Sequence, residues 1–168
     1  MKKIALVLFL YLVHTHVFAT EPFSLDSTAF KLNTMIPAQY SCDGVNQSPP
    51  LAWHSIPEKT QSFVLIMQDP NGPNGVWTHW ILFNIPANVR QLDAGSPTPQ
   101  GATNGKNSWG GLGYRGPCPP LGAHSYVFKL YAVDRVLTLG EGATADTILN
   151  TITGHVLGSA ELVGLYQK

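Results

Sequence analysis

Three runs of apolar residues predict the central β-strands of this chain. Residues 62–69 (SFVLIMQD) and 78–85 (THWILFNI) are β-branched, aliphatic and aromatic, and both have strand length. The first run does not alternate, which indicates burial on both faces. Residues 124–134 (HSYVFKLYAVD) form the third strand, in which the period of two defines one common face. That face carries His124, Tyr126, Phe128, Leu130 and Ala132.

Shorter strands and one helix account for most of the remaining pattern. Weaker strand candidates cover residues 24–26, 51–53 and 161–166. A helix is expected from the Thr144 cap to Thr153, because Thr caps helices well and the glycine that follows stops this one. Since strands outnumber helices, the sequence predicts a mainly β protein, a β-sandwich or barrel with a C-terminal helix.

The N-terminus has the layout of a secretory signal peptide. Lys2 and Lys3 precede an apolar run over residues 4–13, and Ala19 ends a stretch with small residues two positions apart. We expect cleavage after Ala19, leaving one domain over residues 20–168 that is exported to the periplasm or secreted. An uncleaved membrane anchor is the alternative. No later segment is long and apolar enough to cross a membrane.

Composition excludes one large class of partners. The chain has 10 Lys and Arg against 10 Asp and Glu, with no run of basic residues. Loss of Lys2 and Lys3 leaves 8 basic and 10 acidic residues, so the mature chain carries 8 − 10 = −2. Nucleic-acid binding needs a concentrated positive surface, so we exclude it. The hydrophobic fraction of 44% is enough for a packed core.

Export changes the interpretation of the two cysteines. An even number of cysteines in an exported protein favours a disulfide, here between Cys42 and Cys118. Two separate buried thiols remain the alternative. A metal site is less favoured, because neither cysteine has a second Cys or His at ligand spacing.

Four polar residues lie where the predicted strands begin or end. Asp69 ends one central strand and His79 begins the next, with residues 70–77 as the loop between them. If the two strands form a hairpin, Asp69 and His79 meet at the base of that loop. His124 and Tyr126 share a face at the start of the third strand, after a Gly- and Pro-rich stretch over residues 95–122.

Together these groups suit a small anion. Protonated imidazoles and a phenol donate hydrogen bonds to phosphate oxygens, while a carboxylate orients an imidazole or accepts from an amine of the same ligand. Each residue taken alone also has an ordinary structural explanation. If the imidazoles must be charged, affinity should fall as the pH rises through their pKa, near ~6.5 when unperturbed.

Longer motifs resemble a known family. Residues 69–73 (DPNGP) with 76–80 (VWTHW), and residues 116–128 (GPCPPLGAHSYVF), resemble the two signature regions of the phosphatidylethanolamine-binding protein family, nearest to its bacterial Raf-kinase-inhibitor-like branch. Further similar segments extend the resemblance over residues 23–167. It implies an antiparallel β-sandwich with short peripheral helices and a surface pocket for phosphate or phosphorylated lipid head groups.

The family's pocket residues carry over to eight positions of this chain. They are Asp69, Pro73, Trp77, His79, Pro119, Pro120, His124 and Tyr126. Two neighbouring positions depart from the family pattern, because Asn71 replaces a second Asp and Ser125 replaces an Arg that is common there. These departures put in doubt any ligand preference or kinase regulation taken from eukaryotic members.

Other activities have weaker support. Residues 111–116 (GLGYRG) spell a dinucleotide-binding glycine pattern, but the prolines that follow prevent the helix that this motif needs. A hydrolase or metal-dependent enzyme using Asp69, His79 and His124 is the main alternative, yet no nucleophile or metal motif accompanies them. Protease or kinase inhibition through the long loop over residues 95–115 is a third.

We therefore predict a non-catalytic, exported protein that binds a small phosphate-bearing or other anionic ligand and needs no cofactor. The sequence leaves its physiological ligand, protein partner and oligomeric state open.

Overall fold

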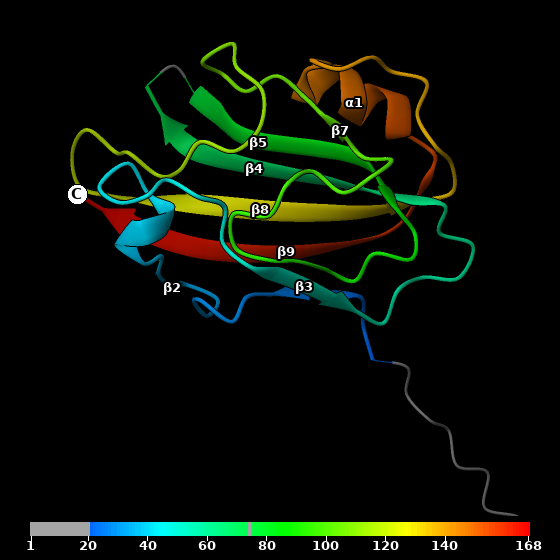
Figure 1. Cartoon of the computed structure of the whole chain (residues 1–168), viewed down its shortest axis with the longest axis horizontal. Helices are drawn as coiled ribbons and strands as arrows, with labels where there is room; N and C mark the ends of the chain where they lie inside the picture. Colours follow the sequence, from blue (N-terminus) through cyan, green and yellow to red (C-terminus); the bar gives the residue numbers. More distant parts are fainter. Residues whose placement is uncertain (1–20, 74) are drawn as a thin grey trace, which may run out of the picture.

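Two β-sheets face each other in the computed structural model, which describes residues 21–73 and 75–168 (Figure 1). The larger sheet has the strand order β2-β9-β8-β4-β5-β7, and the smaller one has the order β1-β3-β6. The predicted signal peptide lies outside the described residues. The elements are β1 (Ser24–Asp26), β2 (Thr34–Met35), the 3-10 helix η1 (Ala38–Tyr40), β3 (Leu51–His54), β4 (Ser62–Gly72), β5 (Gly75–Pro86), β6 (Gln91–Leu92), β7 (Thr103–Asn104), β8 (Ala123–Val133), α1 (Ala145–Ile152) and β9 (Val156–Gln167).

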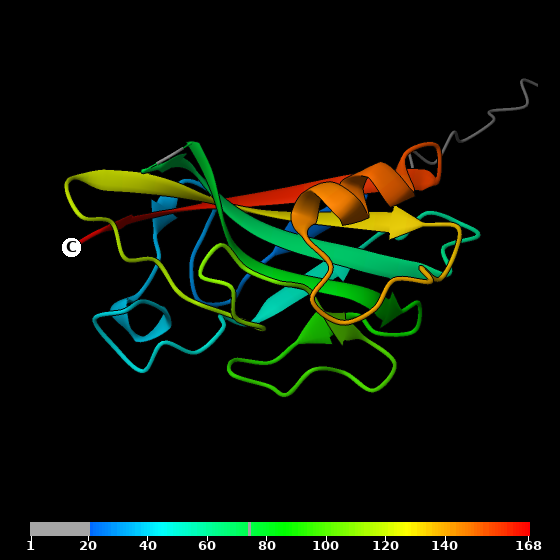
Figure 2. The ribbon, with the colours of Figure 1, turned by 90° about the horizontal axis from the view of Figure 1, so that it is seen from above.

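Strand β4 is buried on both faces, as its continuous apolar pattern predicts. Phe63, Leu65 and Met67 belong to the core between the two sheets. The alternate residues Val64 and Ile66 belong to a second core. This second core lies between the large sheet and helix α1, which crosses the outer face of the strands (Figure 2).

The third strand and the helix also match their predictions. Tyr126, Phe128, Leu130 and Ala132 of β8 all contribute to the core between the sheets. Helix α1 begins after Thr144, whose side chain accepts a hydrogen bond from the backbone amide of Thr147. The mainly β sandwich predicted from the sequence is therefore confirmed.

The hairpin between β4 and β5 is longer than the sequence predicts. Residues 70–77 are expected to be a loop, but β4 continues to Gly72 and β5 already begins at Gly75. Pro70 does not interrupt the pairing, because it lies in an irregular part of the ladder between the Asp69–Trp77 and Gly72–Gly75 pairs. Residues 70–72 and 75–77 of the predicted loop thus belong to the two strands of the hairpin.

Short elements account for the other differences. Strands β2, β6 and β7 have two residues each, which is too short for a sequence pattern. Strand β2 pairs with β9 in parallel, an exception in an otherwise antiparallel fold. Strand β9 starts five residues before the predicted one, at Val156. Within the residues that the structure describes, no helix has the length and apolar character to cross a membrane.

Candidate functional site

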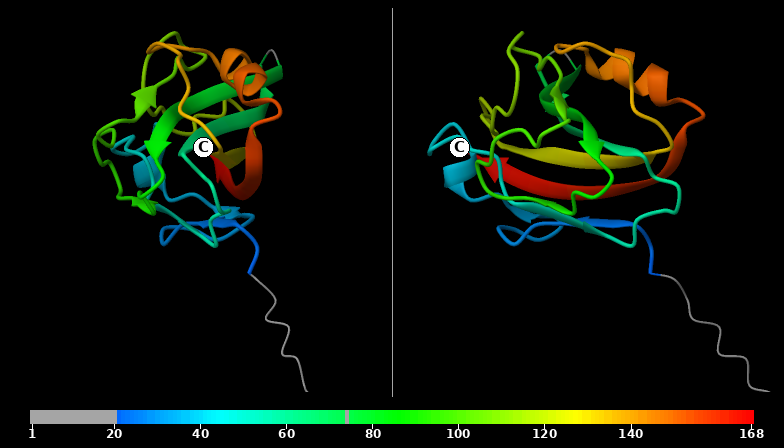
Figure 3. Two further views of the ribbon diagram at one scale, coloured as in Figure 1. Left: turned by 90° about the vertical axis from the view of Figure 1, so that its right-hand side faces the viewer. Right: turned by 45° about the vertical axis from the view of Figure 1, so that its right-hand side comes forward.

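The strand ends that carry the predicted site residues lie at one end of the large sheet. Strand β4 is antiparallel to β5 and to β8, so its last residues lie beside the first residues of those two strands. The C-terminus of β9 ends at the same place (Figure 3). Asp69, His79 and His124 are brought together in this way.

A β-bulge in strand β5 decides which way His79 points. Met67 pairs with Trp80 and Gln68 pairs with Thr78, so His79 is an extra residue without a partner on β4. Trp80 faces the core between the sheets. A regular strand would turn the residue before Trp80 to the opposite face. The bulge instead keeps His79 on the face that contains the site.

All eight predicted residues line one pocket of about 150 Å³. The structure also places Trp109 and Cys118 in its wall, which the sequence interpretation did not include. The complete lining is Asp69, Pro73, Trp77, His79, Trp109, Cys118, Pro119, Pro120, His124 and Tyr126. Residues from three separate parts of the chain therefore form a single hollow.

Asp69 forms a buried pair with His124. The Nδ1 atom of His124 lies 2.7 Å from Oδ2 of Asp69. The other carboxylate oxygen of Asp69 accepts a hydrogen bond from the backbone amide of Asn71 at 2.7 Å. Asp69 itself is only 4% exposed. Both of its oxygens are thus engaged, and His124 is held with Nε2 as its remaining polar atom.

His79 has a different partner from the one expected. The sequence predicts a contact between Asp69 and His79, but the Nδ1 atom of His79 donates instead to the backbone carbonyl of Arg115 at 2.7 Å. The two side chains do line the same pocket, but the side-chain hydrogen bond of Asp69 goes across to His124 on β8. Burial lowers the pKa of the His79 imidazole, although the backbone carbonyl of Arg115 and the Asp69 carboxylate oppose this shift.

Aromatic rings build the wall around these polar groups. The Trp109 ring lies edge-on to Trp77 and to His79, with centroid distances of 5.3 Å and 4.9 Å. Tyr126 contacts the other side of His79 at 5.1 Å. Burial raises the pKa of the Tyr126 hydroxyl, and the Asp69 carboxylate adds to the effect. Tyr126 therefore remains a neutral hydrogen-bond donor.

A side-chain-capped turn presents Trp109 to the pocket. The buried side chain of Asn107 accepts hydrogen bonds from the backbone amides of Trp109 and Gly111, both at 3.1 Å. The turn is fastened to the edge of β5, because the amide of Ser108 donates to the carbonyl of Thr78. The short motif Asn-Ser-Trp-Gly is a turn signal that could have identified Trp109 from sequence.

The guanidinium of Arg115 covers the same indole. It lies 4.5 Å from the centroid of the Trp109 ring, within the range of a cation–π interaction. The backbone amide of Arg115 also donates to the carbonyl of His79. Arg115 thus contacts the pocket wall twice without lining the pocket.

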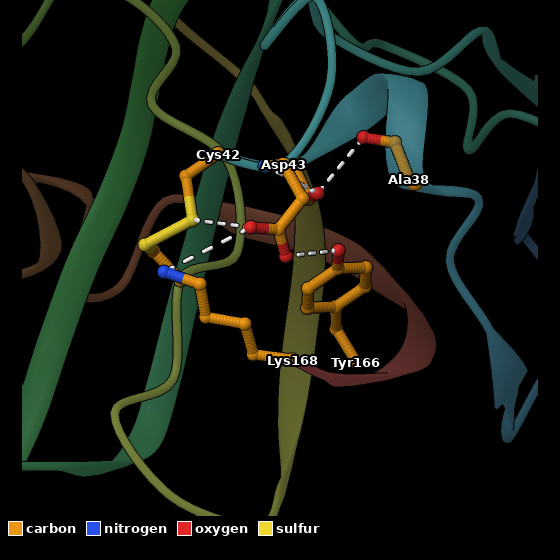
Figure 4. Close-up of polar contacts among 7 residues, drawn as sticks. Ala38, Cys42, Asp43, Tyr166 and Lys168 are labelled. Carbon is orange, nitrogen blue, oxygen red and sulfur yellow. Dashed lines mark hydrogen bonds and ion pairs between the residues drawn. A yellow bond between two sulfur atoms is a disulfide. The ribbon is translucent and has the colours of Figure 1, made fainter.

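A disulfide between Cys42 and Cys118 borders the pocket, as the cysteine count favours. Figure 4 shows Asp43 beside this bridge and next to the end of β9. The Tyr166 hydroxyl donates to Asp43 at 2.7 Å, and the Lys168 amine lies 3.8 Å from the same carboxylate. The segment around Cys42 is therefore joined to the pocket wall and to the C-terminal strand.

The same segment packs closely against Gly116. A Cβ atom at this position would lie 2.2 Å from the carbonyl oxygen of Tyr40, so no larger residue fits. The amide of Gly116 donates to the side chain of Asn46, and the Tyr114 hydroxyl donates to the carbonyl of Tyr40. These contacts fix the start of the proline-rich wall independently of the disulfide.

A larger hollow of about 250 Å³ lies beside β5 and the 96–99 segment. Among the described residues that line it, Tyr114 is the one with an ionisable side chain, and burial raises its pKa. This hollow offers no charge to an anion. Nowhere in residues 21–73 and 75–168 do three or more His, Cys, Asp or Glu side chains gather in a way that could hold a metal ion.

Comparison with known proteins agrees with these features. The sequence model of the family described as "Phosphatidylethanolamine-binding protein" matches residues 26–167. A UPF0098 protein of Methanothermobacter thermautotrophicus is 48% identical over 149 residues, which cover 86% of this chain and 99% of that protein.

Two solved structures are also similar. One is the crystal structure of a putative phosphatidylethanolamine-binding protein homolog, CT736, from Chlamydia trachomatis. It has a TM-score of 0.84 and 41% identity, and the match covers 88% of this chain and 98% of that one. The other is E. coli YbcL, described as a new member of the mammalian PEBP family. It has a TM-score of 0.82 and 29% identity, with 88% and 99% coverage.

Proposed function

The chain belongs to the phosphatidylethanolamine-binding protein family, and from this premise we propose that it is an exported binding protein for a small anion of the phosphate type. The observation that carries the proposal is the pocket itself. Asp69, His124 and Tyr126 come from two strands far apart in the sequence, yet they line one hollow of about 150 Å³.

The polar groups of the pocket suit an oxyanion. Asp69 fixes His124 through Nδ1, so the Nε2–H of a protonated His124 donates to an anion oxygen. The Tyr126 hydroxyl supplies a second donor that carries no charge. Phosphate and the phosphorylated head groups of lipids share the required tetrahedral oxygens, and the aromatic wall of Trp77 and Trp109 limits how large the bound group is.

We further propose that the ligand is bound without turnover. Within the described chain the pocket lining contains no Ser or Thr hydroxyl, and its cysteine is bonded in the disulfide. Burial raises the pKa of the Tyr126 hydroxyl and so disfavours the nucleophilic phenolate. Incubation with generic esterase and phosphatase substrates, with and without zinc, should give no activity above a His79→Ala control.

Export is part of the proposal. A disulfide such as Cys42–Cys118 persists in oxidising compartments and is uncommon in reducing ones. The mass of the protein isolated from its native compartment should correspond to a chain that begins at residue 20. A full-length mass, or free thiols that react without a reductant, would contradict this.

Binding is tested by titration with phosphorylethanolamine and with inorganic phosphate, followed by NMR chemical shifts. His124→Ala should weaken binding by about tenfold or more, because a charge-assisted hydrogen bond is lost. His155→Ala is the matched control, since His155 also pairs with an aspartate, Asp134, but lies outside the pocket. Equal affinities for the wild type and His124→Ala would overturn the proposal.

A further inference from the structure

The two imidazoles of the pocket are backed by different groups. His124 faces the Asp69 carboxylate, which can only accept, so Nδ1 of His124 carries a proton. His79 faces the carbonyl of Arg115, and a carbonyl can only accept, so the proton of a neutral His79 is on Nδ1. Its Nε2 atom then carries a lone pair. Burial of the ring lowers the pKa of His79 and so favours this neutral form.

The surroundings supply little positive charge. In the part of the chain that the structure describes, no Lys or Arg lines the pocket. The guanidinium of Arg115 lies over Trp109, and Lys168 pairs with Asp43 beside the disulfide. A protonated His124 is balanced by Asp69, since the two are 2.7 Å apart. A ligand with two negative charges would therefore bring charge that the pocket lining does not compensate, which is costly in a small, partly enclosed hollow.

A lone pair on His79 adds a second requirement. An anion that presents only oxygen lone pairs would leave Nε2 of His79 without a hydrogen bond, and a desolvated polar atom without a partner costs binding energy. A ligand with a hydrogen of its own satisfies Nε2 while its other oxygens accept from His124 and Tyr126. The pocket thus offers two donors and one acceptor.

We propose, as a refinement that rests on the proposed function, that the pocket selects a singly charged oxyanion carrying its own hydrogen-bond donor. Its acid hydroxyl or its ammonium group donates to Nε2 of His79. Dihydrogen phosphate, a singly ionised phosphate monoester and an ammonium-bearing phosphate ester share this chemistry. Dianions without a donor, and diesters without a donor, do not.

Three small probes separate charge from donor. Dimethyl phosphate has one negative charge and no donor, sulfate has two charges and no donor, and methyl phosphate changes from one charge with a hydroxyl to two charges without one near pH ~6. Their affinities are measured by NMR titration of the mature chain at about pH 5.5 and about pH 8. Dimethyl phosphate is the reference at each pH, because its own charge is constant and it reports the titration of the protein.

At about pH 5.5, methyl phosphate should bind about tenfold more tightly than dimethyl phosphate, because only it satisfies Nε2 of His79. Sulfate should bind at least as weakly as dimethyl phosphate. Between the two pH values, the affinity of methyl phosphate relative to dimethyl phosphate should fall by up to about 100-fold, as its singly charged form disappears. If phosphorylethanolamine still binds at the higher pH, the ammonium is the donor. If its binding is lost there, the acid hydroxyl is the donor.

This inference would be overturned if, at the lower pH, dimethyl phosphate or sulfate bound as tightly as methyl phosphate. The proposed function would still stand in that case. Failure of all the probes, phosphorylethanolamine included, would overturn both. An independent measurement needs no ligand. Nitrogen-15 NMR of the free protein at neutral pH should show His79 protonated at Nδ1 and unprotonated at Nε2. A proton on both nitrogens would refute the inference.

Discussion

Strand β8 has a His–Asp pair near each of its ends, and the two pairs differ in their surroundings. His124 lies at the start of the strand and contacts Asp69 at 2.7 Å, while Asp134 follows its end and contacts His155 at 2.9 Å. The side chains of the first pair are 14% and 6% exposed, and those of the second are 29% and 40% exposed. The same residue types form a candidate site only where they are enclosed.

The two ends also differ in how firmly they are held. Asp134 and His155 are joined by a backbone hydrogen bond in addition to the side-chain contact. At the pocket end, the disulfide of Cys42 joins the wall that carries Pro119 and Pro120 to a second segment. A site that must keep donors at fixed distances from a ligand benefits from such cross-links.

Removal of the disulfide at the pocket end should cause the largest loss of stability. Cys42 and Cys118 are 76 residues apart, so the bridge restricts a long loop of the unfolded chain. The double variant with Cys42→Ser and Cys118→Ser should lose about 4 kcal/mol in the free energy of unfolding, measured with urea. The hydrogen bonds of Gly116 and Tyr114 remain and should keep the pocket formed. Unchanged stability would show that the bridge adds nothing.

Loss of the buried carboxylate should come next. Asp69→Ala leaves His124 and the amide of Asn71 without their acceptor. We expect a loss of about 3 kcal/mol in the free energy of unfolding, together with loss of measurable phosphate binding. Urea unfolding and NMR titration of the same sample give both values. An Asp69→Ala protein as stable as the wild type would mean that enclosure does not distinguish the two pairs.

The second imidazole of the pocket gives a pH effect of intermediate size. Burial lowers the pKa of folded His79 below its unfolded value of about 6.5. Neutral His79 thus makes its full contribution to the free energy of unfolding above pH about 6.5. As the pH falls from there to the lowered pKa, this free energy decreases by at most about 1.4 kcal/mol per pH unit. The NMR titration of its ring protons should have a midpoint below 6.5. A midpoint at or above that value would contradict the burial effect.

Asp134→Ala should have the smallest effect. This pair is accessible to water and salt, which weakens its attraction. The free energy of unfolding should change by less than about 1 kcal/mol, and phosphate affinity should equal that of the wild type. A loss as large as that of Asp69→Ala would remove the contrast between the two ends of β8.

Much of the fold follows from local pattern. The sequence correctly predicts the strands around residues 62–69 and 124–134 and the helix after Thr144. Each of these elements buries one or two faces, which requires a regular pattern of hydrophobic residues. The two-residue strands are too short to show such a pattern. The hairpin extension past Asp69 was not foreseen either, since Pro and Gly usually mark loops.

Four of the eight candidate pocket residues follow from the strand pattern and the other four come from the resemblance to the family, and the structure gathers all eight around one hollow. The contacts within the pocket could not be predicted in the same way. Trp109 reaches the wall through the turn that Asn107 caps, which depends on contacts made in three dimensions. Asp69 hydrogen-bonds to His124, while His79 hydrogen-bonds to the carbonyl of Arg115, although the sequence separation favours a pairing of Asp69 with His79.

The sequence by itself determined the strand core, the helix and the residue types available for chemistry, because hydrophobic burial acts on every second or every third to fourth residue along the chain. Only the tertiary structure decided the roles of the two imidazoles. The bulge at His79 depends on how β5 pairs with β4, and that pairing sets which histidine meets a carboxylate and which meets a carbonyl. Hydrogen-bond partners across strands are fixed by register, and register is a property of the assembled sheet.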